Sequence, residues 1–116
     1  MTEQPIFKIV TANEWLVARE TGVFTGAPVD IADGFIHFST ADQLSETAAR
    51  HFAGKTDLYL VAVDPAVLGA QLKYEPSRGG ALFPHLYGDL PLDAVLWERP
   101  LPLSANGRHD FAGLLG

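Results

Sequence analysis

The run Leu58-Tyr59-Leu60-Val61-Ala62-Val63 restricts the fold of this chain more than any other stretch. It contains no charged residue and has the length of a β-strand. A strand that is apolar on both faces is covered on both sides, so we expect this one at the centre of a sheet, with other elements packed above and below it. Asp64 and Pro65 then end the strand.

Two capping boxes predict the starts of two helices. In this motif a threonine hydroxyl and a polar side chain three residues later each accept a hydrogen bond from a free backbone N–H group. Thr11 with Glu14 predicts a helix over residues 12–20. Thr40 with Gln43 predicts a second helix, whose apolar residues recur at helical spacing.

The rest of the chain divides into shorter segments. Residues 22–33 are rich in turn residues and have no sustained period, so we expect a loop there. Proline and glycine bound residues 82–88, which we also expect to be a loop. Residues 104–116 should form an irregular or loosely docked tail. Further strands are expected over residues 6–10, 35–38, 71–75 and 95–98.

The length and composition predict one globular domain. A chain of 116 residues, 47% apolar and 19% charged, is large enough for a single hydrophobic core but too short for two. We therefore treat residues 1–116 as one domain with an ordered core over about residues 5–100. The absence of cysteine excludes disulfides and thiolate nucleophiles and fits a reducing compartment.

The charge pattern excludes several classes of partner. The net charge is −6, from 14 acidic and 8 basic residues without a basic cluster, so general binding to nucleic acid or to anionic membranes is not expected. No apolar run approaches the length of a membrane span, and the first residues lack the pattern of a secretory signal. We expect a cytoplasmic protein.

The stretch Asp33-Gly34-Phe35-Ile36-His37-Phe38-Ser39-Thr40 is the first candidate site. Strand alternation places Phe35, His37 and Ser39 on one face. The strand leads into a helix start, where free N–H groups and the helix dipole can hold an anion or a polar ligand group. A structural role remains open, with His37 as a hydrogen-bonded core residue and Ser39 and Thr40 as capping hydroxyls.

The stretch Phe83-Pro84-His85-Leu86-Tyr87 is the second candidate. Polar aromatic side chains in a loop often contact ligands, although His85 and Tyr87 could equally anchor the loop. Glu75 joins the site if the sheet turns its carboxylate toward His37 and is otherwise a solvated strand residue. Arg78 lies in the connection between these two segments. His51 and His109 are expected at the surface.

Motifs of several enzyme classes are absent. The sequence has no Gly-x-Ser-x-Gly elbow, phosphate-binding glycine loop or His-Glu-x-x-His helix, so nothing supports a serine hydrolase or a zinc hydrolase. Folding could bring His37 and His85 together with a carboxylate, but their spacing has no metal-site signature. We predict no metal site.

The order of these motifs resembles a known family. Glu14-Trp15, Gly22-x-Phe24-x-Gly26, the stretch from Asp33 to Thr40, and the stretch from Phe83 to Gly88 follow one another as in the bacterial and plant family called domain of unknown function 952. The resemblance extends from near the N-terminus to about Pro100. It implies a small α+β fold, a minimal relative of the ADP-ribosyltransferase fold, with two small β-sheets and flanking helices.

The same resemblance implies a nucleotide-like ligand, with NAD as the candidate cofactor. His37 would then orient a ribose beside Ser39, and Glu75, His85 or Tyr87 would close the pocket. Phe35, Thr40, Arg78 and Phe83 complete the predicted ligand contacts. The chain lacks the His-Gly-Thr form of the NAD-binding motif and a recognisable Gln-x-Glu or Glu-x-Glu pair.

Two hypotheses follow from different classes of function. In the first, the chain is a small enzyme that acts on NAD, ADP-ribose or a related nucleotide, by chemistry like that of ADP-ribosyl- or phosphotransferases. In the second, it is a non-catalytic domain whose pocket binds a small polar metabolite or a protein partner. A carboxylate of Glu75 that points into the His37 pocket favours the enzyme, and one that faces solvent favours the binding domain.

Overall fold

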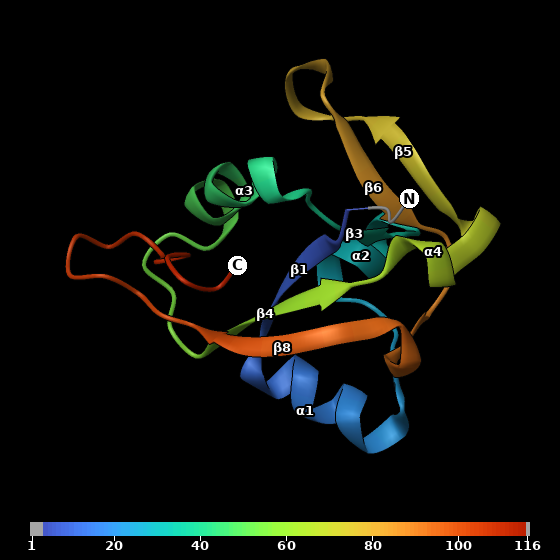
Figure 1. Ribbon diagram of the computed structural model, residues 1–116, viewed down its shortest axis with the longest axis horizontal. Coiled ribbons are helices and arrows are strands. Elements are labelled where there is room, and N and C mark those ends of the chain that lie inside the picture. The colour runs from blue at the N-terminus through green and yellow to red at the C-terminus, as the bar shows by residue number, and fades with distance from the viewer. Residues whose placement is uncertain (1–3, 116) are drawn as a thin grey trace.

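The apolar run Leu58–Val63 forms the central strand, β4, of an antiparallel sheet in the computed structural model (Figure 1). The structure describes residues 4–115, except for the side chain of Arg78. Strand β1 (Ile6–Thr11) pairs with one edge of β4, and β8 (Val95–Leu101) pairs with the other. Side chains of β4 enter two separate apolar clusters, one on each face of the sheet, as predicted for a strand covered on both sides.

A second three-stranded sheet carries both candidate sites. It contains β3 (Ile36–His37), β6 (Leu82–Leu86) and β5 (Leu72–Pro76), with β6 in the middle. Strands β2 (Val23–Phe24) and β7 (Leu90–Pro91) form a small antiparallel pair. The fold is therefore α+β, and its described residues contain three small sheets where the sequence predicted two.

The helices cover both faces of the first sheet. Figure 1 shows α1 (Ala12–Thr21) along one side of β1, β4 and β8, and α3 (Leu44–His51) on the other side. Helix α2 (Pro28–Asp33) lies next to β3, and the single turn α4 (Pro65–Leu68) follows β4. Short 3-10 turns occupy Ala41–Gln43, Gly69–Gln71, Arg78–Gly80 and Leu92–Ala94. Among the described residues no helix is both long and apolar enough to cross a membrane.

The predicted capping box at Thr11 is present. The Thr11 hydroxyl accepts from the Glu14 N–H at 3.1 Å, and the Glu14 carboxylate accepts from the Thr11 N–H at 3.0 Å. At the second predicted box, the Thr40 N–H donates to Gln43 at 3.0 Å, and the chain then forms a 3-10 turn before α3.

Two predicted loops are wrong. Residues 22–33 contain β2 and α2. The helix was not predicted because six residues make fewer than two turns and show no periodicity in the sequence. Residues 82–88 are mostly strand β6, although Pro84 lacks an N–H group. Pro84 still takes part in the strand pairing through its carbonyl, which accepts a hydrogen bond from the Phe38 N–H at 2.9 Å, just past the end of β3.

Strand boundaries also differ from the prediction. Strand β3 has two residues, and Ser39, which was expected to continue it, pairs its backbone with Phe7 of the first sheet at 2.8 Å in both directions. These two backbone hydrogen bonds hold the chain after β3 against β1. Strand β8 continues through Pro100 to Leu101, because an edge strand tolerates proline.

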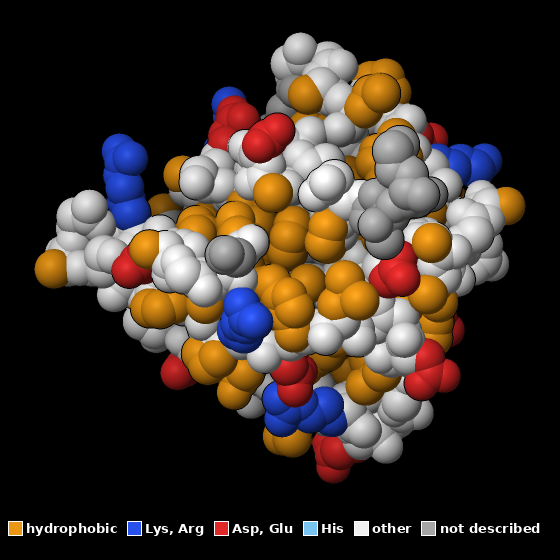
Figure 2. Space-filling model, viewed as in Figure 1, with side chains coloured by type: hydrophobic (Ala, Val, Ile, Leu, Met, Phe, Trp, Pro, Cys, Tyr) orange, Lys and Arg blue, Asp and Glu red, His pale blue; other side chains and the backbone are white. Residues whose placement is uncertain are grey.

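The C-terminal segment forms turns against the second apolar cluster. An isolated bridge joins Leu103 to His109, which is half-buried, and Phe111 and Leu114 pack on the cluster. Arg99 donates to the Leu114 carbonyl at 2.6 Å. Figure 2 shows hydrophobic side chains gathered across the middle of this face of the molecule.

Candidate functional site

A cavity of about 490 Å³ lies where β3, β6, β1, α2 and α3 meet. A volume of this size falls in the usual range for small-molecule sites. Six of its fourteen lining residues are apolar, and four of these are phenylalanines. The other eight have polar side chains, four of them from the two candidate stretches. The lining residues are Phe7, Lys8, Ile9, Val29, Asp33, His37, Phe38, Ser39, Thr47, His51, Phe52, Ser77, Phe83 and His85.

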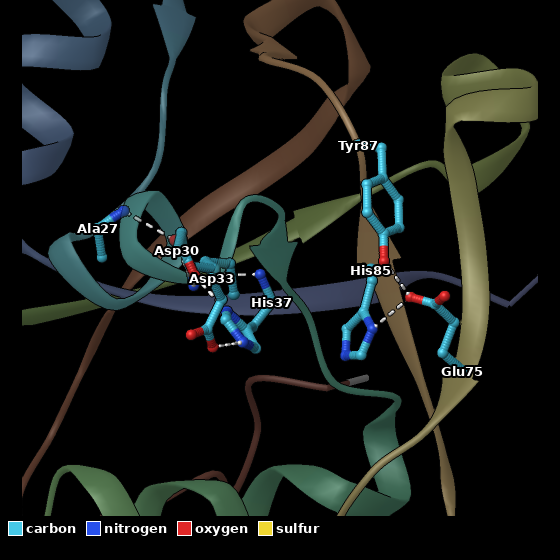
Figure 3. A network of polar contacts seen from close by, with 8 residues as sticks. Ala27, Asp30, Asp33, His37, Glu75, His85 and Tyr87 are labelled. Atoms are coloured by element: carbon cyan, nitrogen blue, oxygen red, sulfur yellow. Dashed lines mark hydrogen bonds and ion pairs between the residues drawn. The ribbon is translucent and has the colours of Figure 1, made fainter.

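The antiparallel pairing of β3 with β6 brings the two predicted histidines together. His37 lies directly opposite His85 in the register, so both side chains leave the same face of the sheet. Their ring centroids are 5.5 Å apart. Figure 3 shows the two imidazoles extending side by side from neighbouring strands, each with a carboxylate on its outer side.

Glu75 on β5 fixes the orientation of His85. Its Oε1 atom lies 2.8 Å from Nδ1 of His85 and 2.7 Å from the hydroxyl of Tyr87 (Figure 3). The hydrogen bonds from Tyr87 and then His85 lower the pKa of the Glu75 carboxyl, so this carboxyl is an ionised acceptor at neutral pH. Nδ1 of His85 therefore carries a proton, and in the neutral imidazole Nε2 is a hydrogen-bond acceptor.

The Nε2 atom of His85 is available to a ligand. His85 lines the cavity and is 5% exposed. Within the described part of the chain, no group forms a hydrogen bond with this nitrogen. A ring nitrogen in this position can accept a hydrogen bond from a ligand or from a water molecule in the cavity.

Asp30 on α2 holds the other histidine. Its carboxylate is 2% exposed and lies 2.6 Å from Nδ1 of His37. It also accepts from Nζ of Lys8 at 3.0 Å and from the backbone N–H groups of Ala27 and His37 at 2.7 and 3.1 Å. Burial alone would raise the pKa of Asp30, but the His37 hydrogen bond and the Lys8 charge outweigh it and lower the pKa to about 2.

His37 has a carboxylate at each ring nitrogen. Nδ1 faces Asp30, and Nε2 lies 3.0 Å from Oδ2 of Asp33, whose side chain is 49% exposed. A carboxylate is a partner for an N–H group, so this arrangement suits an imidazole that carries both protons. His37 therefore has no free nitrogen for a ligand while Asp33 stays in place.

The remaining polar groups support the wall of the cavity. Burial lowers the pKa of Lys8, and the charge of Asp30 opposes that effect. The hydroxyls of Ser39 and Thr47 are 2.8 Å apart and join the segment after β3 to α3. The ring of Phe35 packs on both histidines, with centroids 4.6 Å from His37 and 4.2 Å from His85.

Comparison with known proteins now places the chain in a family. A family model described as Protein of unknown function (DUF952) matches residues 9–98, most of the chain. The chain belongs to the DUF952 family. This confirms the family resemblance of the motifs, and no match supports a relationship to ADP-ribosyltransferases.

Solved structures of one similar protein share the fold. The crystal structure of protein CC0527 from Caulobacter crescentus has 46% sequence identity and a TM-score of 0.93, over 97% of this chain and 98% of that chain. A crystal structure of its double mutant has 45% identity, the same TM-score and the same coverage. The solution NMR structure of CC0527 has 48% identity and a TM-score of 0.84, over 92% of each chain. Among curated proteins, none matches the chain.

The fold of this DUF952 protein gathers part of the predicted residue set at the cavity. His37, Ser39, Phe83 and His85 line it. Glu75 and Tyr87 lie behind His85 and reach the cavity only through its ring. Phe35 packs over both imidazoles without lining the cavity. Thr40 faces Gln43 at the helix start, and the side chain of Arg78 lies outside what the structure describes.

The sequence patterns gave no site role to Asp30, and none to Asp33 beyond its place at the start of the first candidate stretch. These residues were assigned to a loop, but they are three positions apart in α2 and so share a helix face toward His37. Two residues in the sequence could have indicated this helix: Pro28 at its first position and Gly34 directly after its last. His51, expected at the surface, is exposed but also lines the cavity. The described residues contain no cluster of three or more His, Cys, Asp or Glu that could hold a metal.

Proposed function

We propose that the cavity of this DUF952 protein binds NAD, ADP-ribose or a related nucleotide, and that His85 is its acid–base group. The observation that carries the proposal is the Glu75–His85 pair, which leaves Nε2 of a buried imidazole as a free acceptor at the cavity wall. An imidazole held in this way can take a proton from a ligand hydroxyl and return it. A carboxylate at Nδ1 stabilises the imidazolium that forms.

His37 has an electrostatic and orienting role in this proposal. Because Asp30 and Asp33 occupy both of its nitrogens, it does not act as a base. Its Nε2–H can donate to a ribose hydroxyl if the ligand displaces the half-exposed Asp33. The nucleotide class itself rests on the resemblance of the strand and helix pattern to the ADP-ribosyltransferase fold, and the size of the cavity is compatible with part of a nucleotide.

A non-catalytic binding domain is the second candidate, and the position of Glu75 favours it. The carboxylate of Glu75 contacts His85 and Tyr87 and does not line the cavity. It therefore cannot approach positive charge that develops at the anomeric carbon of a ribose bound in the cavity. The two candidates share the same cavity and differ in whether a bound nucleotide is consumed.

Thermal unfolding with NAD, ADP-ribose and nicotinamide tests the proposal. A ligand at one hundred times its dissociation constant adds roughly 2.7 kcal/mol to the free energy of unfolding, a large shift for a domain of this size. We expect this shift in the wild type and in His109→Ala, whose histidine lies outside the cavity lining, and its loss in His85→Ala. If none of the three compounds shifts the transition of the wild type, the nucleotide proposal is wrong.

The variant Glu75→Gln separates the enzyme from the binding domain. Glutamine keeps the size of the side chain but removes the charge that stabilises a protonated His85. For an enzyme, we expect NAD turnover to fall by roughly 10²–10⁴-fold while the ligand-induced thermal shift remains, since general acid–base catalysis contributes about that much. Binding without any nucleotide consumption by the wild type would support the second candidate.

A further inference from the structure

The last turn of α2, residues 31–34, lies at the surface and borders the cavity. Ile31 is 67% exposed, and the three residues after it are exposed as well. The one buried side chain of α2 is that of Asp30, which precedes this turn. A segment with few buried apolar contacts opens at a lower free energy than the core does, so this turn can move without unfolding of the domain.

The residues on either side of this turn are fixed. Asp30, before the turn, is buried and holds His37 through its carboxylate. Phe35, after the turn, packs its ring on His37 and His85. Gly34 has a φ of 87° and, as a glycine, can change its backbone angles easily. The turn therefore has a firm attachment at each end and a residue suited to a hinge beside one of them.

The turn is held against His37 by its own carboxylate. Oδ2 of Asp33 lies 3.0 Å from Nε2 of the imidazole (Figure 3). The Asp33 side chain is 49% exposed, and a contact made by so exposed a carboxylate contributes little to stability. The Gly34 N–H closes the turn by donating to the Asp30 carbonyl at 2.9 Å. These contacts are few enough to break together in a local opening.

Movement of this turn would change what the cavity offers to a ligand. Asp33 is the residue of the turn that lines the cavity, and it occupies Nε2 of His37. When the turn swings away, this nitrogen can contact a ligand, while Asp30 keeps the ring in place through Nδ1. The ligand and the Asp33 carboxylate therefore compete for the same nitrogen.

We propose that residues 31–34 form a flap at the edge of the cavity and that Asp33 is its latch, so that the closed flap inhibits ligand binding at His37. The inference rests on the cavity being the ligand site of the proposed function and adds a conformational step before binding. Opening breaks the contact between Asp33 and His37 and the hydrogen bond between Gly34 and Asp30. It leaves the buried carboxylate of Asp30 in place.

Amide hydrogen exchange, measured by NMR without ligand, tests whether the flap opens. Gly22 is the matched reference, because it ends α1 as Gly34 ends α2. Their φ angles are 85° and 87°, and each N–H donates to the carbonyl four residues earlier, at 2.8 and 2.9 Å. Helix α1 differs in burying Trp15 and Ala18. We expect a protection factor at least about tenfold lower at Gly34 than at Gly22. Equal protection factors overturn the inference.

A pair of alanine variants tests the latch. Asp33→Ala removes the carboxylate that contacts His37 and should lower the protection factor of Gly34 by about threefold to fivefold. Glu20→Ala removes an exposed carboxylate from the last turn of α1 and should not lower the protection factor of Gly22. Loss of an acidic residue at a helix C-terminus stabilises the helix by itself, so only loss of the latch explains a decrease. An unchanged or higher protection factor at Gly34 in Asp33→Ala overturns the inference.

Binding of ADP-ribose distinguishes this inference from the proposed function. If the closed flap inhibits binding, titration calorimetry should give about fivefold tighter binding to Asp33→Ala than to the wild type, and Glu20→Ala should bind as the wild type does. Equal or weaker binding to Asp33→Ala overturns the inference and leaves the nucleotide proposal standing. If none of the three proteins binds ADP-ribose or NAD, the nucleotide proposal is wrong, and the protection factors alone decide whether the flap exists.

Discussion

At the scale of single residues, Asp30 determines how the polar wall of the cavity is built. Its buried carboxylate accepts from Lys8, Ala27 and His37, and so connects β1, the start of α2 and β3. A buried carboxylate in this position is stable only while its partners are present, because an unpaired buried charge is costly. The pKa of Asp30, about 2, expresses how strongly the fold favours the ionised form.

The depressed pKa of Asp30 predicts a loss of stability in acid. The ordinary pKa of the group is 3.8, so the unfolded chain binds this proton more tightly than the folded protein does. The contribution is complete above about pH 4 and is lost as the pH falls toward 2. We expect the free energy of unfolding to fall by roughly 2 kcal/mol over that range, measured by urea denaturation at a series of pH values.

The double variant Asp30→Asn/Lys8→Met is the matched control for this pH effect. It removes both members of the buried ion pair, so no unpaired charge is left, and its stability should depend less on pH between 4 and 2. Glu75, whose pKa is also lowered, contributes to both proteins alike. The same pH profile in both proteins would show that Asp30 is not the source of the loss.

The sequence predicted the two histidines and Glu75, which holds His85, but not Asp30, which holds His37. His37 and His85 stood out because each is a polar aromatic residue in a stretch bounded by turn residues. Lys8 and Asp30 are 22 residues apart, and no local pattern relates them. Only the three-dimensional arrangement of β1 and α2 makes them partners, so a single sequence cannot reveal this pair.

At the scale of elements, α2 is the short helix that sets the geometry of His37. It supplies the carboxylates at both ring nitrogens, from positions three apart on one face. It ends at Gly34, whose φ of 87° lies in the left-handed region and reverses the chain into β3. Helix α1 and the turn that leads into α3 could be predicted from capping boxes, whereas α2 offers only Pro28 and Gly34 as signals, because six residues are too few to show a period.

Replacing Gly34 with alanine should disturb both stability and His37. A left-handed residue with a side chain costs roughly 1–2 kcal/mol, and relaxation of this strain would move Asp33 relative to the imidazole. Gly107→Ala is the matched control, since Gly107 has a φ of 82° in a turn of the C-terminal segment. We expect both variants to lose similar stability in urea, and only Gly34→Ala to shift the imidazole resonances of His37 in NMR spectra. Unchanged His37 resonances in Gly34→Ala would mean that the end of α2 does not position this side chain.

At the scale of the whole molecule, β4 joins two apolar clusters into one folding unit. Val61 and Val63 enter the cluster beneath α1, and Leu58, Leu60 and Ala62 enter the cluster beneath α3. The apolar run predicted this two-sided burial. It could not predict which strands pair, because the β3–β6 contact that forms the site joins segments far apart in the chain.

The two tryptophans report on the two clusters separately. Trp15 is buried in the first, and Trp97 packs against the second, with its ring 6.0 Å from that of Phe7. Since β4 cannot leave one cluster without leaving the other, we expect a single cooperative transition. In each single-tryptophan variant, Trp15→Phe and Trp97→Phe, fluorescence and far-ultraviolet circular dichroism should give the same urea midpoint. If the fluorescence of Trp97 changed at lower urea than the circular dichroism of the same variant, the α3 side, with its wall of the cavity, would unfold as an independent unit.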